Sequence, residues 1–163
     1  MHETLLLRRW LSVLRIVTGA IFVYVGTMHV VGGWATPEVF SQAIGRFAAS
    51  SPFGWYTSTV GSLVLSAPSV FGPLFAFGMV ATGLGLMFGA LTRVAIVAGL
   101  WLNLNNVLIG FSGGPVHHGA NVLMAVVQVA VWQTGAWRWY SLDGLLSGER
   151  PRSVEATPAD AHP

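Results

Sequence analysis

The sequence contains no cysteine, and this absence excludes several kinds of site. The chain cannot form disulfides, thiolate metal sites, CxxCH haem attachments or cysteine-ligated iron–sulfur clusters. Any redox chemistry would therefore depend on a cofactor that is bound in another way.

Charged residues are also scarce. They make up 9% of the 163 residues, whereas roughly 25% is usual for soluble proteins. Hydrophobic residues reach 53%, and the mean hydropathy is +0.64. No basic run or aromatic–basic platform is present that would track a phosphate backbone, so we expect no nucleic-acid partner. The composition predicts a membrane protein that is surrounded by the lipid bilayer.

Four apolar runs are long enough to be membrane-spanning helices: residues 11–32, 70–91, 94–111 and 120–137. Each approaches the ~20 residues that cross ~30 Å of hydrocarbon. The first run is too long for a signal peptide and lacks a small-residue cleavage site, so we expect it to be retained. The sequence predicts an all-α fold, a four-helix transmembrane bundle formed by residues 1–146. A disordered cytoplasmic tail, residues 147–163, is expected to follow it.

Every basic residue is an arginine, and the arginine positions predict the topology. Most lie near the chain ends or in the turn between the second and third runs: Arg8, Arg9, Arg15, Arg93, Arg138, Arg150 and Arg152. Only Arg46 lies in the long loop after the first run. The positive-inside rule then places both termini in the cytoplasm, as in a multi-pass protein of a bacterial or archaeal cytoplasmic membrane.

The loop at residues 34–69 is too long and too apolar for a simple connection. An interfacial amphipathic helix is predicted within residues 37–51, because apolar residues recur there at helical spacing: Val39, Phe40, Ala43, Ile44 and Phe47. Trp55 and Tyr56 follow, and such side chains favour the headgroup level. The loop either forms a lid over the outer end of the bundle or only anchors the protein.

The third and fourth spans each carry their polar residues on one face. Asn103 and Asn106 lie on the same face of the third span. His117, Asn121 and Gln128 follow one another at helical spacing along the fourth. We therefore expect both faces to turn towards the interior of the bundle.

The first span repeats this arrangement with glycine. Gly19, Gly26 and Gly33 are seven residues apart, and Arg15 and His29 fall in the same row. Small residues let neighbouring helices approach closely in membranes. This row should face protein rather than lipid.

These faces predict a polar pocket in the outer half of the bundle. Polar groups inside a bilayer are costly unless they are paired, which makes them functional candidates. Amides and imidazoles can hold the head of a quinone while an apolar groove takes its prenyl tail. We assign proton exchange to His29 and His117 as catalytic residues. Quinone binding is assigned to Asn103, Asn106, His118 and Asn121.

The histidines favour quinone over haem as the cofactor, and we expect no metal site. Adjacent His117 and His118 point to different sides of a helix and cannot chelate together. The same residues also have structural interpretations. Asn103, Asn106 and Gln128 can act as hydrogen-bonding glue between helices, and histidines at a helix end can simply be hydrated. Arg15 can snorkel, or pair with a carbonyl or a lipid phosphate.

Several stretches resemble one known family. LRIVTGAIFVYVGTMH, GLGLMFGALTRVA and WRWYSLDGLL are similar, in this order, to the first helix, the basic turn and the closing motif of the DoxX/DoxD superfamily. LWLNLNNVLIGFSGGP and the long first loop are closer to DoxD, the membrane subunit of thiosulfate:quinone oxidoreductase. The resemblance covers residues 11–146. It implies a four-helix membrane bundle that passes electrons from thiosulfate to the quinone pool, usually with a second subunit.

The resemblance leaves a non-catalytic alternative open, because many DoxX-like proteins have no established reaction. In that alternative the protein is a membrane scaffold or a lipid-handling DoxX-like protein that docks a partner through its glycine rows. Expected partners are a second membrane or periplasmic subunit and further copies of the chain. A small-molecule transporter ranks third, since neither paired charges nor broken helices suggest alternating access.

Overall fold

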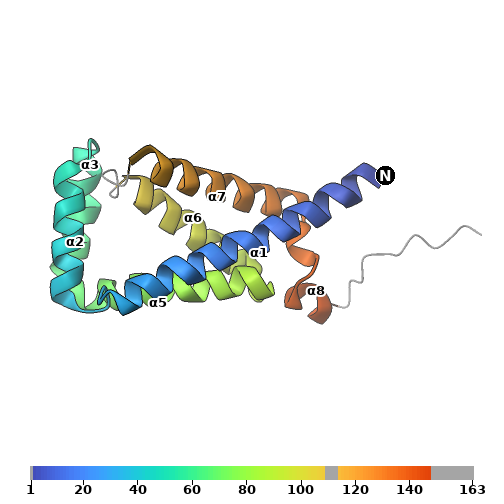
Figure 1. Ribbon diagram of the computed structural model, residues 1–163, viewed down its shortest axis with the longest axis horizontal. Coiled ribbons are helices and arrows are strands. Elements are labelled where there is room, and N and C mark those ends of the chain that lie inside the picture. The colour runs from blue at the N-terminus through green and yellow to red at the C-terminus, as the bar shows by residue number, and fades with distance from the viewer. Residues whose placement is uncertain (1, 109–113, 148–163) are drawn as a thin grey trace, which may run out of the picture.

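The computed structural model describes residues 2–108 and 114–147, and these residues form helices and short connections without a β-strand. Four long helices run alongside one another (Figure 1): α1 (His2–Val31), α5 (Pro68–Phe88), α6 (Thr92–Leu108) and α7 (Gly114–Thr134). α1 packs on α5 and α7, and α6 packs on the same two helices. The expectation of an all-α fold is confirmed for the described residues.

One end of the four long helices is covered by residues 37–66, which we call the cap (Figure 1). Its helices are α2 (Pro37–Ser50), α3 (Gly54–Tyr56), the π-helical turn η1 (Thr57–Gly61) and α4 (Ser62–Ser66). α2 is the amphipathic helix that the sequence predicts, and it buries Phe40, Ala43 and Ile44. Proline at the first helical position favours its start, because the missing N–H would have no partner there.

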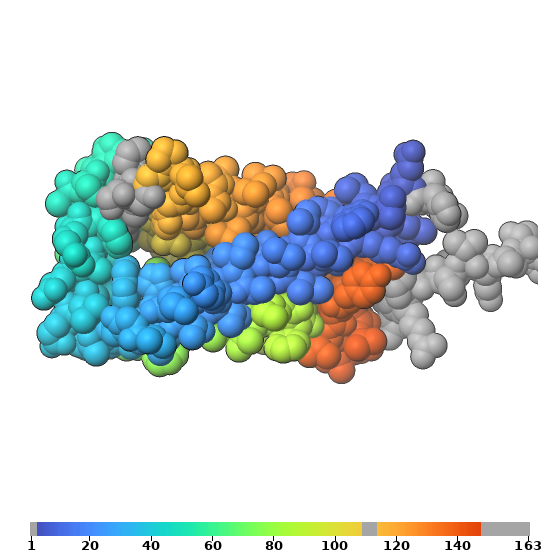
Figure 2. Space-filling model, in the orientation of Figure 1, coloured from blue at the N-terminus to red at the C-terminus, as the bar shows by residue number. Residues whose placement is uncertain are grey.

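The opposite end is closed by the last part of the described chain. After α7, the short helices η3 (Ala136–Arg138) and α8 (Leu142–Leu146) pack against one another, and η3 also contacts α1. Figure 2 shows this segment against the first half of α1. The Ser12 hydroxyl joins the two segments by donating to the carbonyl of Ala136 at 2.7 Å.

α1 and α5 approach each other along glycines. A Cβ at Gly19 would lie 2.7 Å from the carbonyl oxygen of Gly83, and one at Gly26 would lie 2.8 Å from the backbone nitrogen of Val80. These two members of the predicted glycine row therefore face protein. Gly33 does not extend the row, because α1 ends at Val31 and Gly33 lies in the following turn with φ +78°.

Two of the described helices, the stretch Glu3–Val31 of α1 and α5, are long and apolar enough to cross a membrane. Large apolar side chains lie on their outer surfaces: Val31 is 79% exposed, and Leu74 is 63% exposed. Such a surface is costly in water.

The boundaries of α6 and α7 differ from those predicted. α7 begins at Gly114, six residues before the predicted start, so that His117 and His118 lie inside the helix. Gly114 and Gly135 have positive φ, which starts and ends α7 sharply. The end of the predicted third span, residues 109–111, and the tail residues 148–163 lie outside the described residues.

Candidate functional site

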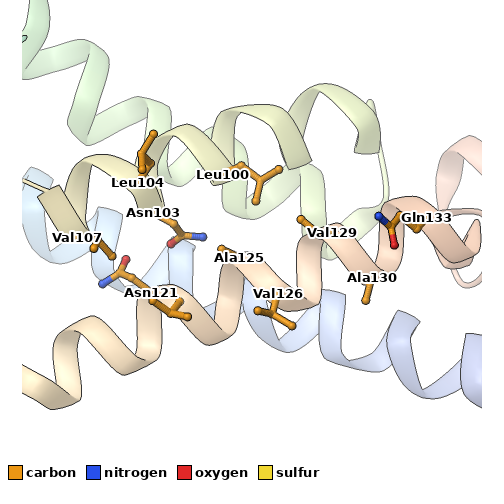
Figure 3. A pocket seen from close by; sticks show the side chains of 11 residues that line it. Leu100, Asn103, Leu104, Val107, Asn121, Ala125, Val126, Val129, Ala130 and Gln133 are labelled. Atoms are coloured by element: carbon orange, nitrogen blue, oxygen red, sulfur yellow. The ribbon is translucent and has the colours of Figure 1, made fainter.

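A groove of about 660 Å³ lies between α6 and α7. Its walls are mostly aliphatic and include Leu100, Leu104, Val107, Val122, Val126 and Val129. Asn103 and Asn121 also line it, and Figure 3 shows their amides pointing into the space between the two helices. The groove thus offers a long apolar surface with the amides of Asn103 and Asn121 near one end and that of Gln133 at the other, within the volume range typical of ligand sites.

A hydrogen-bonded network at the cap end of the groove joins α6 to α7. The Asn106 Nδ2 donates to Asn121 Oδ1 at 3.3 Å. The Asn121 Nδ2 donates to the backbone carbonyl of His117 at 2.8 Å and lies 3.3 Å from His117 Nε2. Three of the predicted site residues therefore lie in one network.

This network determines which nitrogen of His117 carries the proton. Nε2 accepts from Asn121, so a neutral ring carries its hydrogen on Nδ1. A neutral imidazole can both accept and donate a proton.

A second pair of amides lies deeper between the helices. Asn103 and Gln128 are 1% and 2% exposed, and the Asn103 Nδ2 donates to Gln128 Oε1 at 3.4 Å. Within the described residues, Asn103 Oδ1 and Gln128 Nε2 have no hydrogen-bond partner. Gly99 makes room for this pair, because a Cβ there would collide with the Gln128 amide. Burying unpaired polar atoms is costly, which marks the pair as a candidate ligand contact.

The two other histidines lie at the margin of the site. His118 follows His117, with the ring centroids 5.7 Å apart. His29 belongs to an aromatic cluster under the cap: its ring centroid lies 4.2 Å from that of Trp34 and 5.5 Å from that of Phe75. Its Nδ1 donates to the carbonyl of Val25 at 2.7 Å. Within the described residues, no hydrogen bond joins His29 to the amides of the groove.

Asn105 lies on a different face of α6 from Asn103 and Asn106, and it connects α6 to the cap. Its Oδ1 accepts a hydrogen bond from the Tyr56 hydroxyl at 2.8 Å. Burial raises the pKa of that hydroxyl and keeps it protonated as a donor. Nearby, the Ser51 hydroxyl donates to the Leu108 carbonyl at 2.6 Å. The sequence carried one signal for this contact, a third asparagine turned away from the polar face.

Arg15 and Asp143 organise the end of the bundle far from the cap. Arg15 is 1% exposed, and its Nη2 donates to the carbonyl of Tyr140 at 2.7 Å. Asp143 accepts from the backbone N–H groups of Leu91 and Thr92 at 2.9 and 2.7 Å. Of the interpretations that the sequence allowed for Arg15, the structure favours pairing with a carbonyl.

Within residues 2–108 and 114–147, no three His, Asp or Glu side chains form a group that could hold a metal ion.

Comparisons with known proteins leave the family of this chain open. No protein-family model, no curated protein and no solved structure matches it.

Proposed function

We propose that this protein is a small multi-pass membrane subunit of a quinone-linked oxidoreductase, and that it binds the quinone in the groove between α6 and α7. One observation carries the proposal. An apolar groove of about 660 Å³ is lined by Asn103, whose buried Oδ1 has no partner within the described residues. A long apolar molecule with a polar head fits both features.

The proposed membrane arrangement uses all four long helices as spans, with both chain ends in the cytoplasm. It is supported by arginines and indoles at the end far from the cap. Arg93 lies over the ring of Trp137 at 4.6 Å, and Arg138 lies over the same ring at 4.9 Å. Arg9 lies over Trp139 at 5.4 Å. Such pairs are typical of the positively charged cytoplasmic interface.

The residues present fit a quinone in two ways. The aliphatic wall of Val107, Val122 and Val126 matches an isoprenoid tail. Asn103 Oδ1, a buried acceptor without a partner within the described residues, matches a hydroxyl group on the head in its quinol form. When bound, a quinone accepts two electrons and two protons and becomes a quinol.

In this proposal the chain orients the head and exchanges protons. Asn103 binds a head oxygen, and Asn106 holds Asn121 in position through its hydrogen bond. His117, whose imidazole lies next to Asn121, exchanges protons with the outer surface. His29 supports that exchange from the neighbouring aromatic cluster, and His118 lies beside His117.

The electron donor and the partner subunit come from the resemblance to DoxD alone. That resemblance implies thiosulfate as the donor and a second membrane or periplasmic subunit that receives its electrons. The alternative of a non-catalytic scaffold that docks a partner through its glycine rows is less well supported. Gly19 and Gly26 pack against α5 and are not available to another protein. The lipid-handling alternative remains testable, since an acyl chain would fit the same groove.

A photoreactive short-chain quinone, added to the purified protein in lipid nanodiscs, tests the proposal. Labelling should fall on α6 and α7, and Val126→Phe, which fills the groove, should reduce it by at least fivefold. Leu123→Phe is the matched control, because Leu123 is 65% exposed on the same helix and does not line the groove. If Val126→Phe leaves the labelling unchanged, quinone does not bind in this groove. The same conclusion follows if solvent extracts of the purified protein contain phospholipid but no quinone.

A further inference from the structure

The two amides of the Asn103–Gln128 pair differ in their position relative to the groove. Asn103 lines the groove, whereas Gln128 does not. One hydrogen bond joins the two amides, from Asn103 Nδ2 to Gln128 Oε1. What remains is an acceptor on Asn103 and a donor on Gln128, both buried and without a partner within the described residues.

Rotation of both amides by half a turn preserves the bond between them but reverses its direction. Gln128 Nε2 would then donate to Asn103 Oδ1, and the Asn103 Nδ2 would become the group without a partner. Amide oxygen and nitrogen are nearly the same size, so the rotation changes hydrogen bonding and leaves packing almost unaltered. In one arrangement Asn103 presents an acceptor to the groove, and in the other it presents a donor.

The two redox states of a quinone require these two arrangements. A quinone carbonyl can only accept a hydrogen bond, so it needs a donor. A quinol hydroxyl donates, so it is best satisfied by an acceptor. A side chain fixed in one orientation would leave one redox state facing an unmatched polar atom, which reduces affinity for that state.

We propose that Asn103 and Gln128 form a donor–acceptor switch that lets the groove bind quinone and quinol with similar affinity. The proposal rests on the proposed function, because it requires the quinone head to reach Asn103. Gln128 acts as a positioning residue: it does not line the groove, but its orientation determines which atom Asn103 presents. Gly99 provides the space, since a Cβ there would collide with the Gln128 amide. The bound couple would then keep a reduction potential close to that of the free pool.

The test compares dissociation constants for decylubiquinone and decylubiquinol, measured anaerobically on the purified full chain in nanodiscs. The wild-type ratio should lie within about threefold of one. Gln128→Glu should favour the quinol by about tenfold, because an ionised carboxylate can only accept and therefore holds the Asn103 Nδ2 towards itself. A tenfold preference raises the midpoint potential of the bound couple by about 30 mV. The infrared spectrum verifies that the new carboxyl group is ionised.

Two further variants complete the test. Asn103→Leu should weaken binding of both forms by a similar factor, because it removes donor and acceptor together. Gln42→Glu makes the same chemical change on the exposed face of α2 and should leave the ratio at the wild-type value.

The outcomes separate the two proposals. Failure of the wild type to bind either form would overturn the proposed function and the switch with it. Binding with a wild-type ratio beyond about threefold would overturn the switch alone, and this measurement requires no variant to fold. An unchanged ratio in Gln128→Glu, with the carboxylate ionised and quinone still bound, would also overturn the switch.

Discussion

Arg15 on α1 donates a hydrogen bond to the backbone carbonyl of Tyr140, with 2.7 Å between Nη2 and the oxygen. The same nitrogen lies 3.4 Å from the carbonyl oxygen of Trp139. Tyr140 has φ +49°, a conformation that side chains rarely adopt. Gly89 also contributes, because any Cβ there would collide with the Arg15 guanidinium. One buried cation thus fixes the path of the chain as it leaves α7.

Arg15→Met should destabilise the protein by about 2 kcal/mol, because hydrogen bonds from a charged donor to two carbonyls are lost. Thermal unfolding in detergent, followed by circular dichroism, measures the change. Arg9→Met is the control. Arg9 is exposed and only lies over Trp139, so a loss of ~0.5 kcal/mol or less is expected. Equal losses in both variants would contradict the role of Arg15.

Asp143→Asn should lower stability at neutral pH and have little effect in acid. Burial disfavours the charged carboxyl, but hydrogen bonds from Thr92 and Leu91 and the charge of Arg15 outweigh it and lower the pKa. Because the pKa of Asp143 is lower in the folded protein than in the unfolded chain, its carboxylate stabilises the fold above about pH 4. This stabilisation is lost as the pH falls through the folded-state pKa. The difference in melting temperature between wild type and variant should therefore shrink below about pH 4. A difference that stays constant from pH 7 to pH 3 would refute this.

Tyr56→Phe should loosen the cap without unfolding the long helices. The variant leaves Asn105 Oδ1 without its hydroxyl donor, at a cost of about 1 kcal/mol. Amide hydrogen exchange in α3 and α4 should then rise about fivefold, while exchange in α5 stays the same. Tyr24→Phe serves as the control, because Tyr24 is 64% exposed on α1. A uniform rise across all helices would show that the contact is not local.

Two glycine substitutions on α5 should have opposite effects. Gly83→Ala places a Cβ against the backbone of α1, 2.6 Å from the nitrogen of Val23, and should destabilise by about 1 to 3 kcal/mol. Gly78→Ala meets nothing within 4 Å and should stabilise by up to about 1 kcal/mol through helix propensity. Equilibrium unfolding of both variants measures the difference. A neutral Gly83→Ala would mean that α1 and α5 pack less closely than described.

Periodicity in the sequence predicted the helices and some of their facing surfaces. Apolar spacing located α2, and glycine spacing identified Gly19 and Gly26 as contact positions, because both signals arise from local helix geometry. The predicted glycine row does not extend to Gly33, because α1 ends before that residue. Helix ends depend on single glycines with positive φ, and sequence spacing does not reveal those.

The partners of the polar residues could be predicted only in part. Asn103, Asn106, His117 and Asn121 lie between the adjacent helices α6 and α7, as a shared polar face suggests. His29 lies among aromatic rings, because its neighbours are set by where the cap folds back onto α5. Asn105 was not assigned a partner, since Tyr56 is 49 residues away along the chain.

The contact between Arg15 and Tyr140 joins residues 125 positions apart in the sequence. During translation, α1 leaves the ribosome long before the carbonyls that its guanidinium requires. A nascent chain that stops before residue 139 would carry an arginine without these acceptors. This end of the fold can therefore close only after the chain has been made as far as Tyr140.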